Sequence, residues 1–217
     1  MSATVMAKVR AALGPDIASR QQAVAQWMAA GRASGTPALA ASVSAADAVA
    51  IFVARARAVK ATVDVIAAAA LAERIGTQTA QWGRHGGVAI ADRPVLRALR
   101  EAPWANGARI GAVTATDAVG IVQADGGAAE TGTLVLVSGH GQPTAMAFLP
   151  EHCIAVVPAS AIRLDYNAVI RAHCAGRDWP RSINLVTGPS RTADIEEVLL
   201  LGAHGPRSLT IYVLEDC

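Results

Sequence analysis

The 217-residue sequence is poor in cysteine and in aromatic residues. Its three cysteines, Cys153, Cys174 and Cys217, are widely spaced and form no CxxC pair. Such an odd, scattered set is typical neither of a disulfide framework nor of the thiolate sites that hold zinc or iron–sulfur clusters. We therefore expect no metal and no cofactor in this chain, and a reducing, cytoplasmic compartment.

An excess of charge of one sign is also missing. The chain has 19 Lys and Arg against 17 Asp and Glu, so its net charge is +2, and it contains no basic block. Aromatic residues make up 4% of the chain, and Trp82, Trp104 and Trp179 stand isolated. These features exclude a nucleic-acid partner, which needs a basic surface or a stacking platform. The longest weakly polar run, residues 63–71, is too short to cross a bilayer, so we expect no membrane span.

What the sequence does contain is a large hydrophobic fraction, 53% of all residues, much of it alanine. Residues 4–13 and 16–30 place apolar side chains at helical spacing. Residues 31–37, Gly-Arg-Ala-Ser-Gly-Thr-Pro, are typical of a linker. We expect an N-terminal helical segment over residues 1–36 and an α/β domain over residues 37–217. The N-terminal helices either pack on a neighbouring subunit or fold back.

Strand-like and helix-like segments alternate along the rest of the chain. Apolar and β-branched runs predict strands at residues 62–66, 86–91, 109–113, 134–137, 153–157, 183–187 and 209–214. Helical patterns lie at residues 44–60, 67–75, 92–100, 161–173 and 191–201. This alternation predicts an α/β fold with a mostly parallel sheet flanked by helices. Around Glu130 two short strands follow each other directly, which indicates an inserted hairpin, and residues 114–127 are expected to form the connection that leads into it.

The first polar stretch that could carry chemistry is Glu130-Thr131-Gly132-Thr133. The apolar run 134–137 follows it directly, and such a run is typical of a strand covered on both faces. Glu130 is therefore expected at the mouth of a buried sheet, where it would accept a hydrogen bond from a ligand or act as a base. The threonines offer hydroxyls that donate and accept. The alternative is that Glu130 and Thr131 satisfy backbone amides at a hairpin or bulge.

A second polar cluster follows the strand predicted at residues 183–187. Its members are Gly188, Ser190, Arg191, Thr192 and Asp194. Ser190 or Thr192 can cap the helix predicted at residues 191–201, and the free N–H groups together with Arg191 would then bind a phosphate or carboxylate. Asp194 already complements the helix dipole, which favours the alternative of an ordinary capped helix. The segment is neither a Walker A loop nor a GxGxxG motif.

A third cluster, Gly202-Ala203-His204-Gly205-Pro206, closes that predicted helix. His204 is able to act as an acid, a base or a ligand near neutral pH, or simply to serve as a hydrogen-bonding loop residue. Asp125 lies on the approach to Glu130 and precedes two glycines, which is typical of a turn. The alternative for Asp125 is a paired-carboxylate site with Glu130.

Three segments, in this order and spacing, resemble the LUD-domain family and its lactate-utilisation protein C group. They are residues 128–136 (AAETGTLVL), residues 149–157 (LPEHCIAVV), and residues 187–196 with 201–206 (TGPSRTADIE and LGAHGP). The resemblance covers roughly residues 85–214, and it departs from the family at Gly127, where the family usually has a larger aliphatic or aromatic residue. It implies a fold similar to that of sugar-phosphate isomerases and CoA-transferases.

The resemblance also implies a role in a bacterial system that oxidises L-lactate to pyruvate, in which partner subunits carry the iron–sulfur clusters. The resulting hypothesis is an accessory subunit with a pocket for a small anionic ligand. Residues 130–133, 188–194 and 204–206 would form this pocket at one edge of the sheet, because ligands of open α/β sheets bind outside the carboxyl ends of the strands. The rival hypothesis is a stand-alone enzyme with CoA- or nucleotide-dependent acyl-transfer or ligase chemistry, and a third is a scaffold that only docks its partners. Since the family does not name a reaction, a catalytic role stays open.

Overall fold

The computed structural model describes residues 43–82, 86–139, 141–176, 179–193 and 199–215, with residues 7, 8, 11, 12, 19, 22, 23, 25 and 26 of the N-terminal part. Of residues 192, 193 and 199–201 it describes only the backbone. The chain divides into two compact units, Met1–Ser42 and Val43–Cys217. The described residues of the first unit are helical, whereas most of the two predicted N-terminal helices and the whole of the predicted linker lie outside the described residues. The boundary placed after residue 36 stays a prediction.

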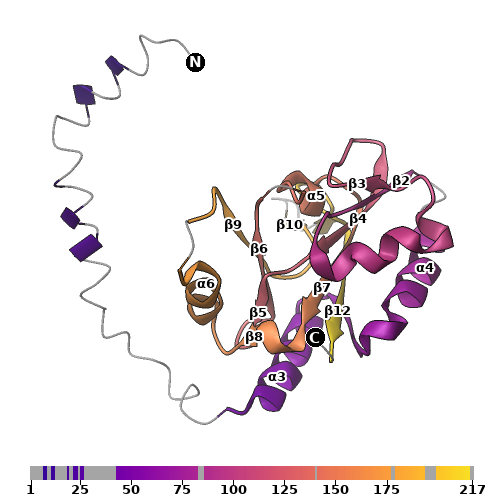
Figure 1. Ribbon diagram of the computed structural model, residues 1–217, viewed down its shortest axis with the longest axis horizontal. Coiled ribbons are helices and arrows are strands. Elements are labelled where there is room, and N and C mark those ends of the chain that lie inside the picture. Colours follow the sequence, from indigo (N-terminus) through magenta and orange to yellow (C-terminus); the bar gives the residue numbers. More distant parts are fainter. Residues whose placement is uncertain are drawn as a thin grey trace. The chain divides into compact units, whose positions relative to one another are not determined.

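A six-stranded parallel sheet forms the centre of the second unit (Figure 1). Its strands, in spatial order, are β1 (Thr62–Ile66), β12 (Ser208–Leu214), β7 (His152–Pro158), β4 (Asp117–Gln123), β2 (Gly87–Ile90) and β3 (Arg109–Ile110). Every neighbouring pair is parallel. The predicted α/β fold with a mostly parallel sheet is therefore confirmed.

Strand β4 was predicted as a connection, which is wrong, because it lies inside the sheet between β2 and β7. Gly120 interrupts its apolar pattern, and the structure shows why a glycine stands there. A Cβ at Gly120 would lie 2.2 Å from the carbonyl oxygen of Met146, in helix α5 (Ala145–Phe148). The close passage of α5 over β4 thus requires the residue that hides this strand in the sequence.

Between residues 44 and 101, the helical elements of this unit lie at or close to the predicted helical segments. Helix α3 (Ala45–Ala58) begins where Ser44 accepts a hydrogen bond from the backbone N of Asp47, at 3.1 Å. The remaining helical elements are η2 (Ala68–Ala70), α4 (Leu71–Trp82), η4 (Pro94–Glu101), η5 (Pro103–Ala105), η6 (Ala159–Ala161) and α6 (Tyr166–Cys174). Phe52 of α3 and Ile75 of α4 are completely buried in the hydrophobic core.

A second, mixed sheet contains the predicted hairpin. Its strands, in spatial order, are β8 (Ile162–Arg163), β5 (Gly126–Ala128), β6 (Thr133–Val137) and β9 (Ile183–Val186). Strands β5 and β6 are antiparallel, and all five residues of β6 are buried, as its apolar run predicted. Strand β9 pairs antiparallel with β6, so its predicted place in a parallel alternation is wrong.

The helix predicted at residues 191–201 is also wrong, because β10 (Arg191–Ala193) and β11 (Leu199–Leu201) form an antiparallel pair. The backbone N of Gly202 donates to the carbonyl oxygen of Ser190 at 3.1 Å, which continues this pairing beyond the strands. Gly202 has φ +83°, so the chain leaves β11 in a conformation that favours glycine. Pairing between distant residues thus overrides the local helical pattern.

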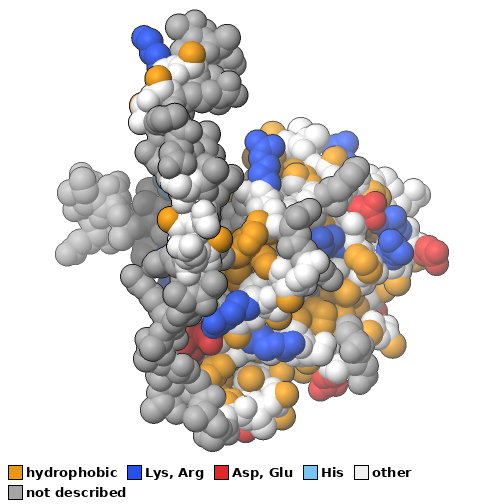
Figure 2. Space-filling view, turned by 60° about the vertical axis from the view of Figure 1, so that its left-hand side comes forward, with side chains coloured by type: hydrophobic (Ala, Val, Ile, Leu, Met, Phe, Trp, Pro, Cys, Tyr) orange, Lys and Arg blue, Asp and Glu red, His pale blue; other side chains and the backbone are white. Residues whose placement is uncertain are grey.

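Figure 2 shows the outer surface on one side of the molecule, where hydrophobic, basic and acidic side chains are interspersed. Two large apolar residues outside the core are Trp179, 62% exposed, and Leu185 of β9, 48% exposed. Within the described residues, no helix is both long and apolar enough to cross a membrane.

Candidate functional site

Three threonine side chains connect the first and second polar clusters. The Oγ1 atoms of Thr131 and Thr133 lie 2.7 Å apart, and those of Thr133 and Thr187 also lie 2.7 Å apart. Thr133 is 4% exposed, whereas Thr131 is exposed. Three hydroxyls joined by two hydrogen bonds use two of their three hydrogens, so this threonine cluster keeps one hydrogen that it can donate to a ligand.

Two glycines hold the turns of the threonine cluster against the end of α3. Gly132 has φ +67° and Gly188 has φ +80°. A Cβ at Gly132 would lie 2.3 Å from the backbone N of Ala56, and a Cβ at Gly188 would lie 2.5 Å from the carbonyl oxygen of Val59. Both positions therefore need glycine for conformation and for space. The two turns are docked on the same helix end.

Glu130 lies in the turn between β5 and β6 and is half-buried. Its backbone N donates to the carbonyl oxygen of Leu164 at 2.9 Å. Among the described residues, no hydrogen bond or ion pair engages its carboxylate. The backbone of Glu130 thus braces the turn, while its side chain is left to interact with a ligand.

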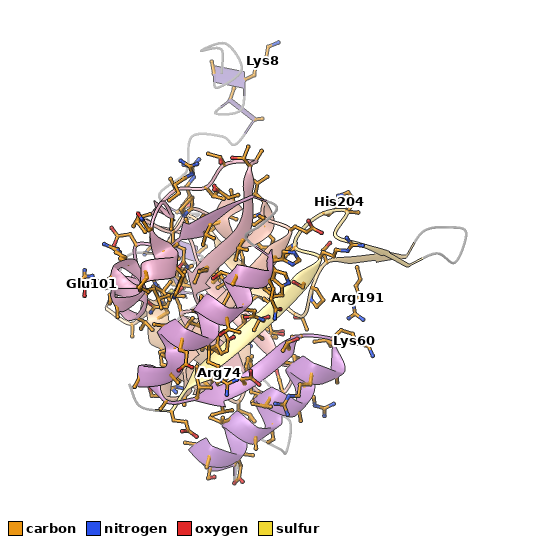
Figure 3. The ribbon with its side chains drawn as sticks, turned by 90° about the vertical axis from the view of Figure 1, so that its right-hand side faces the viewer. Lys8, Lys60, Arg74, Glu101, Arg191 and His204 are labelled. Carbon is orange, nitrogen blue, oxygen red and sulfur yellow. The ribbon has the colours of Figure 1, made fainter. Side chains whose placement is uncertain are left out.

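Arg191 is the basic residue of the second cluster, and its side chain is exposed. Figure 3 shows Arg191 and Lys60 on the same side of the molecule. The contact between Gly188 and Val59 brings their two segments together. Because β10 begins at Arg191, the anion site predicted at a helix N-terminus does not form. The side chain of Thr192 and the whole of Asp194 lie outside the described residues.

Ser190 joins the second and third clusters. Its backbone N donates to the carbonyl oxygen of Pro206 at 2.9 Å, and its Oγ accepts from the backbone N of His204 at 3.4 Å. Ser190 therefore fixes the loop that carries His204 and Gly205 rather than capping a helix. The predicted proximity of these two clusters is present in the structure.

A cavity of about 750 Å³ lies beside this loop. Its walls come from Gly86, residues 115–118, residues 148–151, residues 202–205 and Arg207. These segments lead into β2, β4, β7 and β12, so the cavity lies at the amino ends of the parallel strands, and we name it the amino-edge cavity. His204 and Gly205 line it, but Glu130 and the threonine cluster do not. The structure thus divides the predicted pocket into two zones.

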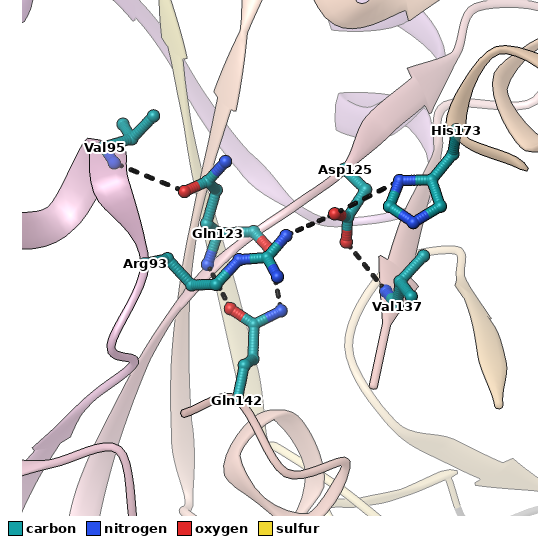
Figure 4. A network of polar contacts seen from close by, with 7 residues as sticks. All are labelled: Arg93, Val95, Gln123, Asp125, Val137, Gln142 and His173. Carbon is teal, nitrogen blue, oxygen red and sulfur yellow. Dashed lines mark hydrogen bonds and ion pairs between the residues drawn. The ribbon is translucent and has the colours of Figure 1, made fainter. Parts of the chain in front are cut away.

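Asp125 takes part in a polar network that the sequence did not reveal (Figure 4). Its side chain is 4% exposed and forms an ion pair with Arg93. It also accepts from the backbone N of Val137 at 2.8 Å, and His173 Nδ1 lies 3.5 Å away. Neither the turn role nor the paired-carboxylate site predicted for Asp125 matches these contacts. The sequence contained one sign of this network. Arg93 and Asp125 each follow the carboxyl end of a strand, and these two strands are parallel neighbours in the sheet.

Cys153 is buried inside the parallel sheet, in strand β7. Burial raises the pKa of the Cys153 thiol to about 12. Across the described ranges of the chain, no group of three or more His, Cys, Asp or Glu is arranged to hold a metal ion. Cys153 is therefore a small core residue.

The family comparison matches the LUD domain over residues 37–214. Lactate utilization protein C from Halalkalibacterium halodurans is 39% identical over 102 residues, which cover 45% of this chain and 44% of that protein. The protein of the same name from Geobacillus kaustophilus is 42% identical over 102 residues, covering 45% and 42%. The uncharacterized protein YkgG from Escherichia coli is 36% identical over 104 residues, covering 46% and 45%. The matched segment spans less than half the length of each of these relatives.

Among solved structures, the chain is similar to a DUF162 family protein from Deinococcus radiodurans. The TM-score is 0.55 with 21% sequence identity, and the match covers 80% of this chain and 100% of the other. At this identity the likeness concerns the fold alone.

Proposed function

Because this chain belongs to the LUD domain family, we propose that it is an accessory subunit of a bacterial system that oxidises L-lactate to pyruvate. The observation that carries the proposal is the match to proteins named Lactate utilization protein C, at 39 and 42% identity in two bacteria. The fold of the proposed subunit is the one shared by sugar-phosphate isomerases and CoA-transferases, and the six-stranded parallel sheet supports this assignment.

In this proposal the electrons of lactate pass to iron–sulfur clusters on partner subunits. Oxidation of the hydroxyl group to a ketone releases two electrons and two protons, and a redox centre must accept the electrons. The buried Cys153, whose thiol is held protonated, is unsuited to ligate a cluster. The accessory subunit would hold or present the small acid to its partners.

The proposed ligand is a small anion such as a carboxylate, bound over the threonine cluster. Glu130 and the spare hydroxyl hydrogen would contact its polar groups, and Arg191 would supply the positive charge. The remaining residues of the proposed pocket are Thr131, Gly132, Thr133, Gly188, Ser190, Thr192, Asp194, His204 and Gly205. Two supporting observations are the Glu130 carboxylate without a partner among the described residues and the exposed Arg191.

The test replaces Glu130 and Arg191 in a strain that depends on this chain for growth on lactate. We expect Glu130→Gln and Arg191→Ala each to abolish growth on lactate while the melting temperature of the purified chain stays unchanged. Arg97→Ala is the matched control, since Arg97 is an exposed arginine on η4. Unfolding of both variants would show that the cluster is structural, and normal growth of both would refute the pocket.

The alternative function is a stand-alone CoA- or nucleotide-dependent enzyme. The observation that favours it is the amino-edge cavity, whose volume of about 750 Å³ is far larger than a three-carbon acid needs. A thermal-shift screen of the purified chain with lactate, pyruvate, CoA and ATP separates the two functions. Stabilisation by CoA or ATP alone would favour the enzyme.

A further inference from the structure

The amino-edge cavity has no role in lactate handling as proposed above. Its walls are four loops that precede parallel strands, whereas the ligands of open α/β sheets usually bind at the opposite, carboxyl edge. We propose that the amino-edge cavity is a separate binding site for an uncharged nitrogen heteroaromatic ring of the nucleobase class. This inference does not depend on the lactate role.

The size of the cavity indicates a ligand larger than a metabolite of three carbons. Ligand sites typically measure about 300–1,000 Å³ and combine apolar walls with a few polar groups. A cavity of about 750 Å³ falls within this range. The space persists because one wall is made of Gly202, Ala203 and Gly205, which have little or no side chain. At Gly205 a Cβ would lie 3.3 Å from Ser190 Cβ, so a larger residue there would be crowded.

Another wall of the cavity is apolar and suits the face of a flat ring. Phe148, Leu149 and Pro150 line it. Leu149 is 50% exposed, which is unusual for a leucine adjoining the core of a folded unit. Phe148 Cδ1 lies 3.8 Å from the position of a Cβ on Gly205, so the apolar and glycine-rich walls approach each other at this end. A planar ring would lie on the apolar wall beside the point where the two walls meet.

The two carboxylates that line the cavity, Glu151 and Asp117, are each paired with an arginine, so the phosphates of a bound nucleotide would gain no affinity from these pairs. Arg207 Nη1 lies 3.2 Å from Glu151 Oε1. The Asp117 carboxylate is paired with Arg109, whose Nε lies 3.1 Å away. No surplus of positive charge remains on these side chains to offset several phosphate charges, so the site favours a ligand without net charge.

Among the polar groups, Thr116 offers an acceptor and Arg207 offers donors. Burial alone would raise the pKa of Asp117, but hydrogen bonds from Thr114 and Arg109 outweigh it and hold that pKa below its ordinary value. The ionised carboxylate only accepts, so Thr114 Oγ1 must donate to it, at 3.0 Å. Thr116 Oγ1 must then donate to Thr114 Oγ1, also at 3.0 Å, and keeps only lone pairs for a ligand. Arg207 retains N–H donors beyond its bond to Glu151. A nucleobase edge carries the matching N–H donors and ring-nitrogen acceptors.

The experiment uses saturation-transfer NMR and titration calorimetry on the full chain, with adenosine, guanosine, cytidine and uridine as probes. We expect at least one nucleoside to bind, L-lactate not to compete with it, and ATP to bind no more tightly than adenosine. Failure of all four nucleosides to bind at millimolar concentration would overturn the proposal. Tighter binding of ATP would overturn the argument from charge.

Two half-exposed leucines provide a matched pair of variants. Leu149→Arg should weaken nucleoside binding at least tenfold, whereas Leu185→Arg on β9, away from the cavity, should leave it unchanged. Thr116→Val, which removes the acceptor at an exposed position, should weaken binding about tenfold without lowering the melting temperature. Equal effects of the two leucine variants, or no effect of Thr116→Val, would show that the nucleoside binds elsewhere.

Discussion

Replacing Asp125 with asparagine should destabilise the chain more than any surface substitution. Asp125 is 4% exposed and neutralises Arg93, whose side chain is 21% exposed. Asparagine keeps the shape and can still accept from the backbone N of Val137, so the change isolates the lost charge. Breaking a buried ion pair costs about 3–5 kcal/mol, and the partial exposure of Arg93 places the expected loss near the lower end, at about 3 kcal/mol.

The assay is urea unfolding at pH 7, followed by circular dichroism. The slope m should stay constant while the midpoint falls, which identifies the change as one of stability. The double variant Arg93→Met with Asp125→Asn removes both charges and keeps the acceptor for Val137, and its free energy of unfolding should lie close to that of the wild type. A loss below about 1 kcal/mol for Asp125→Asn, or a double variant as unstable as the sum of the single ones, would refute this account of the network.

The other predictions concern three sites. Folding lowers the pKa of Asp117, so the ionised carboxylate stabilises the fold above its ordinary pKa, and this contribution is lost as the pH falls through the folded-state pKa. Asp117→Asn should therefore be less stable than the wild type at pH 7. Urea titrations should show the difference in stability closing below about pH 4. Gly132→Ala should cost clearly more in thermal unfolding than Gly107→Ala, which serves as its control because Gly107 also has a positive φ but would place its Cβ in open space. The control alone should cost about 1–2 kcal/mol, and equal losses would contradict the clash with α3. Iodoacetamide should leave Cys153 unmodified in the folded chain at pH 8 and alkylate it in urea, as measured by peptide mass spectrometry, and rapid labelling of the folded chain would contradict its burial.

The sequence was a good guide wherever local chemistry decides the structure. The helical pattern at residues 44–60 predicted α3, and the run after Thr133 marks β6 because an uninterrupted apolar strand has to be buried on both faces. The polar turn before β6 could be placed for the same reason. These features depend on neighbours within a few residues, which the sequence displays directly.

The wrong predictions concern segments whose structure depends on residues elsewhere in the fold. Gly120 makes β4 look like a loop, although the glycine is there to admit the backbone of Met146. Arg191 opens a strand because Ser190 pairs with residues of the 202–206 loop, which the helical pattern of residues 191–201 conceals. Asp125 looks like a turn residue, and only the folded sheet brings Arg93 and His173 to it.

Helix α3 supports the turns at Gly132 and Gly188 only through its last residues, and its other end lies far from them. At about 1.5 Å per residue, its 14 residues span roughly 21 Å between Ala45 and Ala58. The helix starts within three residues of the border between the two units of the chain. Gly132 and Gly188 both rest on its far end, so the two turns that present the threonine hydroxyls share one support.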